Sequence, residues 1–237
     1  MAIALFAFLA FCGVRLQTAG IDIALGGLEV SWRLYYLVAL LVIVGTMIPF
    51  FASFERRDVQ ARELVVLATL AALAVAGRVA FFFVPQFKPV CAVVIIAGVC
   101  FGGESGFLVG SVAGFVSNFF FGQGPYTPWQ MFCFGIVGFV AGILFHRGLL
   151  KPTKPALCIY GGLATFILYG GIINLGSLLI MGLPLTLASI IACYASALPF
   201  DLVHAAATVF FLFILGTPLL KMIDRIKTKY GLDDPIV

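Results

Sequence analysis

Charged residues are scarce in this sequence. Asp, Glu, Lys and Arg make up only 10% of its 237 residues, whereas 63% are hydrophobic, and the mean hydropathy is +1.18. A soluble domain of this size could not bury so much apolar surface. The composition therefore excludes a soluble globular protein and indicates an all-α integral membrane protein, because the apolar runs lack the alternation that barrel strands require.

Catalytic and nucleotide-binding motifs are also missing. The chain has two histidines and no HExxH, GxSxG or acidic cluster with histidine, so we expect no enzyme activity. No GxxxxGK[ST] sequence is present, so any ATP hydrolysis would take place in partner ATPases. The six cysteines form no CxxC or Cys/His cluster, which predicts no metal site, and the net charge of +4 does not suggest nucleic acid.

Apolar runs indicate about eight membrane spans. A span needs about 20 residues, and the runs are separated by charged, glycine-rich or proline-containing segments. Residues 15–33 are expected to form a loop, and Pro199 to kink the last run. The runs cover residues 1–14, 34–54, 64–84, 90–101, 107–121, 129–145, 156–181 and 187–220.

The distribution of Lys and Arg predicts orientation and domain boundaries. With eight spans, the basic segments fall on the cytoplasmic side and both termini are cytoplasmic. We expect four parts: an N-terminal hydrophobic hairpin, a charged cytoplasmic connector, a six-helix solute-binding core and a cytoplasmic basic tail. Their ranges are residues 1–54, 55–63, 64–220 and 221–237.

Residues 115–131 carry the most informative break in an apolar run. Gly and Pro at residues 122–125 cannot continue a helix, and polar side chains survive in a membrane only at the interface or around a polar cavity. We therefore predict the mouth of a solute pocket, with a second loop at residues 83–89 as part of its lid. The candidate solute contacts in these two loops are Gln86, Asn118, Gln123, Tyr126, Trp129 and Gln130.

Ionisable residues within spans are the second group of candidates. Arg78 could reach the outer interface or pair with an anionic solute group. Asp201 and His204 lie three residues apart and share a helix face; they could contact solute or neutralise each other between helices. Asn174 and Tyr169, in the glycine-rich span, are lesser pocket candidates.

Alanines recur every four residues at Ala68, Ala72, Ala76 and Ala80, which places them on one ridge of a helix. Such a ridge gains dispersion energy when another helix backbone packs closely. Two interpretations stay open: packing within this chain, or docking of another membrane subunit.

These features together resemble the substrate-binding S-components of energy-coupling factor (ECF) vitamin transporters. The similarity covers about residues 60–228 and is silent about residues 1–54. It rests on the alanine ridge and on residues 78–89 (RVAFFFVPQFKP), 101–110 (FGGESGFLVG) and 117–131 (SNFFFGQGPYTPWQM), of which the last is the most specific.

The resemblance implies a transport subunit in a prokaryotic plasma membrane. It would capture a vitamin outside the cell and associate with an ECF transmembrane coupling subunit and two cytoplasmic ATPases; Ala68, Ala72 and Ala76 would form the partner interface. Cobalamin is the favoured solute, bound non-covalently, with queuosine, pyrimidine or pyridoxine types as alternatives. A stand-alone secondary carrier is the remaining rival, because Asp201 and His204 could couple ions.

Overall fold

The computed structural model describes residues 20–25, 28–56 and 60–232. The first expected span, residues 1–14, lies outside the described residues. Strands β1 (Gly20–Leu25) and β2 (Leu28–Arg33) pair antiparallel from Gly20↔Arg33 to Leu25↔Leu28. We predicted a loop at residues 15–33, and this prediction is wrong for residues 20–25 and 28–33, which form strands. Two glycines separate the strands, and residues 28–33 alternate apolar and polar side chains, which together are a hairpin signal.

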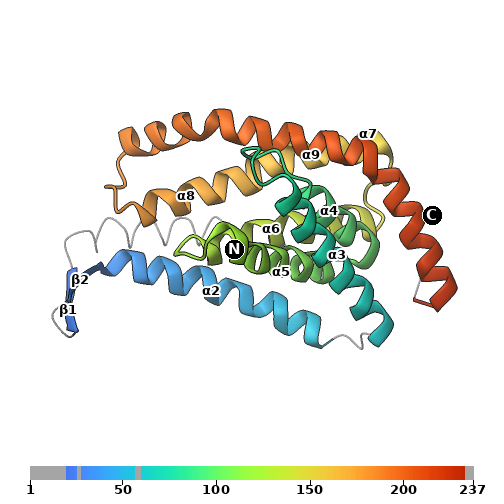
Figure 1. Ribbon diagram of the computed structural model, residues 1–237, viewed down its shortest axis with the longest axis horizontal. Helices are drawn as coiled ribbons and strands as arrows, with labels where there is room; N and C mark the ends of the chain where they lie inside the picture. The colour runs from blue at the N-terminus through green and yellow to red at the C-terminus, as the bar shows by residue number, and fades with distance from the viewer. Residues whose placement is uncertain (1–19, 26–27, 57–59, 233–237) are drawn as a thin grey trace.

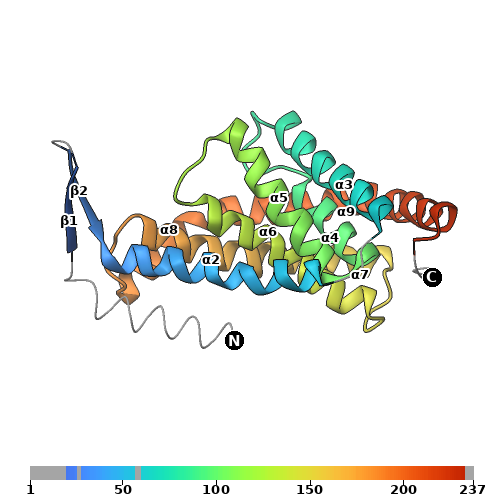
Figure 2. The same cartoon turned by 90° about the horizontal axis from the view of Figure 1, so that it is seen from below.

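Apart from short loops, the rest of the described chain is helical, and its helices run largely side by side (Figures 1 and 2). Among the described residues, five helices are long and apolar enough to cross a membrane: Ala61–Ala80, Gly103–Phe121, Thr127–His146, Lys154–Ile180 and Leu187–Tyr230. The elements are α2 (Leu34–Glu55), α3 (Ala61–Ala80), α4 (Val90–Phe101), α5 (Gly103–Phe121), α6 (Thr127–Ala141), η1 (Gly142–His146), α7 (Lys154–Leu163), η2 (Ala164–Gly170), α8 (Gly171–Ile180) and α9 (Leu187–Tyr230). The fold class is thus that of a helical membrane protein.

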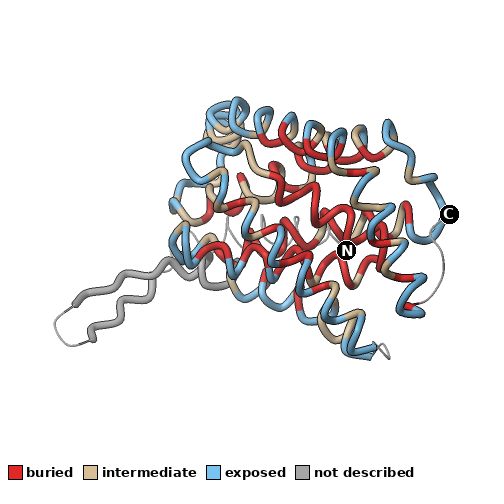
Figure 3. The backbone as a smooth tube through the Cα atoms, turned by 45° about the vertical axis from the view of Figure 1, so that its right-hand side comes forward, coloured by how far each residue is buried: buried red, intermediate tan, exposed pale blue. Residues whose placement is uncertain are grey.

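Helix α4 forms the centre of the bundle and is surrounded by α3, α5, α6 and α9. All twelve of its residues are buried, as the red core of Figure 3 illustrates. Twelve helical residues rise about 18 Å, short of the roughly 30 Å hydrocarbon layer. The apolar run at residues 90–101 is therefore a helix, as predicted, but is too short to count as a complete span.

Helix α2 packs on the bundle and is not separate from it. Phe50 stacks on Phe107 of α5 with ring centroids 4.2 Å apart. Ile43 and Met47 join the same buried cluster as Trp129. The C-terminal part of the predicted hairpin, residues 1–54, is thus an additional helix against α5, α6 and α8.

Helix α9 continues beyond residue 220, where we expected the core to end. It is a single 44-residue helix that contains Pro199 and Pro218 and includes most of the basic tail. Its last turns meet the start of α3, where Arg62 Nη1 donates to the Tyr230 carbonyl at 3.3 Å. Figure 1 shows this segment turning across one end of the bundle.

Candidate functional site

A cavity of about 390 Å³ lies where α6, η2–α8 and α9 meet the two predicted loops. Six of the eleven predicted solute contacts line it, of which Gln86 comes from residues 83–89 and Tyr126 and Gln130 come from residues 115–131. About half of the lining is polar and the rest is aliphatic or aromatic. The lining residues are Gln86, Tyr126, Gln130, Tyr169, Ile173, Asn174, Ser177, Ile180, Met181, Ala197, Phe200 and Asp201.

Asp201 supplies a carboxylate to the cavity from α9. Asn174 of α8 donates its side-chain Nδ2 hydrogen to Asp201 Oδ2 at 2.7 Å. Gly170 makes room for this pair, because a Cβ at that position would lie 3.0 Å from the Asp201 carboxyl carbon. Residues of α8 and α9 therefore fix the carboxylate through Oδ2, and Asp201 is one of the residues that line the cavity.

Gln130 offers a second acceptor. Its side chain is 8% exposed, and its Nε2 donates to the Tyr169 hydroxyl at 3.1 Å. Its Oε1 is buried and accepts no hydrogen bond from the described residues. A buried carbonyl oxygen without a donor costs about 1–3 kcal/mol. The position therefore calls for a donor from outside the described residues.

The loop after α5 is held by its own polar side chains. The Thr127 hydroxyl donates to Gln123 Oε1 at 2.9 Å and accepts from Asn118 Nδ2 at 3.3 Å. The Tyr126 hydroxyl donates to the Gly122 carbonyl at 2.5 Å, and Gly122 has a φ of +95°, which favours glycine. Asn118 and Gln123 shape the loop and are not in the cavity lining.

Arg78 lies behind this loop and is 7% exposed. It donates to the Ser117 hydroxyl and to Asn118 Oδ1, the latter at 3.0 Å. Its guanidinium carbon lies 4.5 Å from the Phe121 ring centroid. Both hydrogen-bond acceptors are neutral, and among the described residues no carboxylate pairs with it. Arg78 therefore ties α3 to α5 and does not line the cavity.

Lys88, in the loop between α3 and α4, adds a second cation near Arg78. Its Nζ donates to the Val84 carbonyl at 2.9 Å. Burial lowers the pKa of Lys88, and the neighbouring Arg78 charge lowers it further. The side of the loops near Arg78 is thus electropositive, whereas Asp201 makes the α9 side of the cavity acidic.

His204 and Trp129 are buried beside the cavity and do not line it. His204 Nε2 lies 3.5 Å from Cys91 Sγ, and its ring meets Tyr169 edge-on at 4.7 Å. Trp129 is 1% exposed and packs on Gly176 of α8. Asp201 and His204 therefore point to different surroundings, although they share one side of α9.

The alanine ridge is uncovered. Helix α3 turns Leu67, Leu70, Ala71, Ala74 and Arg78 inward, whereas the ridge alanines are exposed. They line an apolar groove of about 720 Å³ between α3 and α5. None of the described residues packs over the ridge, so the interpretation that it packs within this chain is wrong for the part of the chain that the structure describes. The groove is lined by Ala68, Ala71, Ala72, Val75, Ala76, Val79, Ala80, Val112, Val116 and Phe120.

Several lining residues were absent from the predicted set. Ile173 and Ser177 lie four and eight residues after the predicted Tyr169, so the three share one helix face beside the cavity. That spacing was a usable signal in the sequence. Phe200 and Met181 carry no such signal, because only tertiary packing places them there.

Comparison with known proteins assigns the family. A model described as "Family of unknown function (DUF6580)" matches residues 58–222, and the chain belongs to this family. A UPF0397 protein of Vibrio atlanticus is 32% identical over 124 residues, which are 49% of this chain and 68% of that protein. UPF0397 proteins of Aliivibrio fischeri and Aliivibrio salmonicida are 35% identical over 91 residues, and the chain spans about half of their length. No solved structure matches the chain.

Proposed function

We propose that this membrane protein is the solute-binding subunit of an ATP-driven importer of the ECF type. The observation that carries the proposal is the cavity, which Gln130 and Asp201 both line, and the Gln130 Oε1 acceptor has no donor among the described residues. Polar groups converging on a partly apolar pocket are typical of small-molecule sites. The part of the chain that matches the family, residues 58–222, contains every residue of the cavity lining.

The cavity favours a compact solute that donates hydrogen bonds. Its volume of about 390 Å³ is near the lower end of the roughly 300–1,000 Å³ range of ligand pockets. That volume suits a pyridoxine, pyrimidine or queuosine type of molecule better than a corrinoid such as cobalamin. A carboxylate and an amide oxygen would recognise ring N–H, amine or hydroxyl groups. We therefore propose a vitamin precursor of that size in place of cobalamin.

The groove on α3 and α5 supports the need for a partner subunit. It exposes a continuous apolar surface of small residues, into which a helix of another membrane protein could pack closely. ATP hydrolysis would then come from cytoplasmic ATPases joined to that partner, since the chain has no phosphate-binding loop. A ridge that none of the described residues covers favours a subunit over a stand-alone carrier.

The first test is a thermal-unfolding screen of the detergent-purified protein against vitamins and their precursors, with cobalamin included. A bound solute at 100 times its Kd stabilises the folded state by about 2.7 kcal/mol. Stabilisation by one compact donor-rich compound would support the proposal. Stabilisation by cobalamin alone would contradict the solute class, and a flat response to the whole panel would contradict solute binding.

Docking is tested by a matched pair of substitutions on α3. Ala72→Trp fills the groove, whereas Leu73→Trp puts the same side chain on an exposed neighbouring position outside it. We expect Ala72→Trp to abolish cellular uptake while solute binding by the purified protein stays intact, and Leu73→Trp to preserve both. Normal uptake by the Ala72→Trp variant would favour a secondary carrier, because transport would then not require the groove.

A further inference from the structure

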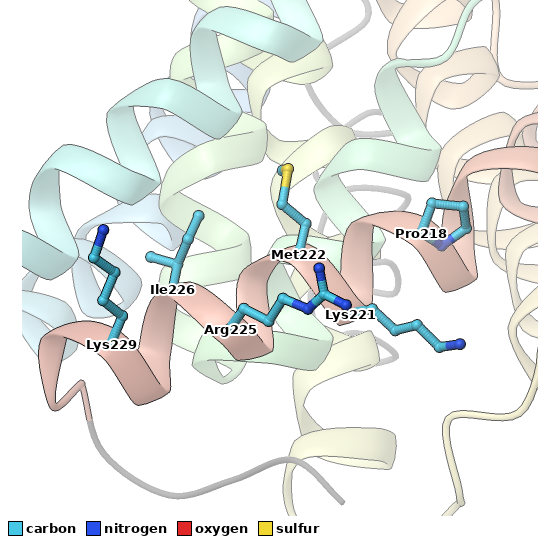
Figure 4. A pocket seen from close by; sticks show the side chains of 6 residues that line it. All are labelled: Pro218, Lys221, Met222, Arg225, Ile226 and Lys229. Atoms are coloured by element: carbon cyan, nitrogen blue, oxygen red, sulfur yellow. The ribbon is translucent and has the colours of Figure 1, made fainter.

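The last turns of α9 carry a row of cations on one side. Lys221, Arg225 and Lys229 follow one another at intervals of four residues, so they lie along one helix face, and all three are exposed. Together with Pro218, Met222 and Ile226 they line an open groove of about 410 Å³, which Figure 4 shows along this segment. The groove thus combines three positive charges with an aliphatic wall.

The opposite face of this segment fixes it to the bundle. Ile223 is 1% exposed and belongs to the main buried cluster. Lys227 Nζ donates to the Cys100 carbonyl at the end of α4, at 2.8 Å. The segment is therefore not a loose tail: its buried side binds the end of the bundle, and its cationic side faces away.

The exposed face of α9 changes character at Pro218. Before the proline, Phe210, Phe213 and Ile214 are about half exposed, as expected for a surface that faces acyl chains. Lys221 lies eight residues after Phe213, two steps of four along the same face. One strip of α9 thus passes from apolar to cationic, in the order in which a phospholipid passes from acyl chain to phosphate.

Within the part of the chain that the structure describes, the cations of the groove have no anionic partner. Among the described residues, no hydrogen bond or ion pair engages Lys221 or Arg225, and no acidic residue lines the groove. We propose that this groove binds the headgroup of an anionic phospholipid of the cytoplasmic leaflet. Arg225 and Lys221 hold the phosphate, and Met222 and Ile226 contact the glycerol and the first methylenes. The site is independent of the proposed solute and of the α3 groove.

A lipid-selection experiment tests this site. The full-length protein is equilibrated in detergent micelles that contain equal amounts of phosphatidylglycerol and phosphatidylcholine, and the retained lipids are counted by native mass spectrometry. The test variant is K221Q/R225Q/K229Q. The matched control, R147Q/K151Q/K154Q, removes an equal number of charges at the same end of the bundle, two from the loop between η1 and α7 and one from the first residue of α7. Unfolding temperatures in phosphatidylcholine alone verify that both variants fold.

We expect the wild-type protein and the loop control to retain phosphatidylglycerol preferentially. Each Lys or Arg near an anionic lipid surface raises the binding constant about fivefold. Each neutralised residue should therefore lower the preference for phosphatidylglycerol by about that factor. An unchanged preference in the α9 variant, or an equal loss in the loop control, would overturn the proposal. Displacement of the lipid by millimolar inorganic phosphate would show a site for soluble anions. If the α9 variant kept its preference for phosphatidylglycerol but no longer bound an acidic protein partner, the groove would be a protein interface and the lipid proposal would be wrong.

Discussion

A glycine crossing at the centre of the bundle gives the sharpest stability prediction. Gly98 of α4 faces Gly138 of α6, and a Cβ at Gly98 would lie 2.1 Å from the Gly138 carbonyl oxygen. Because the obstacle is backbone, no side chain can rotate away, and Gly98→Ala must push α4 and α6 apart by about 1 Å. Overpacking of this kind costs about 1–3 kcal/mol, and rigid neighbours favour the upper end. We expect a loss of about 3 kcal/mol.

The assay is thermal unfolding of the purified protein in detergent. At about 2–4 °C per kcal/mol for a chain of this size, Gly98→Ala should lower the Tm by about 6–12 °C. Gly171→Ala is the matched control, since it lies in a helix with nothing within 4 Å of the new Cβ. Its expected effect is between zero and about 1 kcal/mol of stabilisation. Equal unfolding temperatures for the two variants would refute the close approach of α4 and α6.

Two further predictions concern the cavity and use the compound that stabilises the wild-type protein most. Gly170→Ala should displace the Asp201 carboxylate and weaken binding of the compound about tenfold, because a hydrogen bond to a charged group contributes about 1.5–3 kcal/mol. Binding is measured by calorimetry, and the control variant Gly171→Ala should bind the compound as the wild-type protein does. Gln86 has a φ of +56°, so Gln86→Gly should raise the Tm by relieving about 1 kcal/mol of strain, and Gln86→Ala should not. Both Gln86 variants should lose the amide contact and bind the compound equally weakly; wild-type affinity in either would remove Gln86 from the solute site.

Most of the helical architecture could be read from the sequence, because apolar length and helix breakers act locally. Gly122 and the residues after it end α5 where the break was predicted, and the apolar runs from residue 64 onward match α3 to α9 in order. The span count could not be read in the same way. A run of twelve apolar residues is too short for the membrane but suits a helix enclosed by others, and only packing shows that α4 is enclosed.

The alanine ridge illustrates a different limit. Spacing alone places Ala68, Ala72 and Ala76 on one face of α3, but it cannot say whether that face meets another part of the chain. In the structure α3 packs against α4 and α5 and buries Leu70 and Ala74, so the ridge on its other face is exposed. The sequence therefore identified the surface and left its partner open.

The candidate site shows why polarity by itself is an incomplete guide to function. Gln123 and Gln130 lie seven residues apart and looked alike in the sequence. Gln123 satisfies its oxygen with Thr127, four residues away, and so belongs to the loop. Gln130 donates to Tyr169 across the bundle and leaves its own oxygen without a donor beside the cavity. Because a buried acceptor without a donor is costly, hydrogen-bond satisfaction distinguishes Gln130, beside the cavity, from Gln123, within the loop, where polarity alone does not.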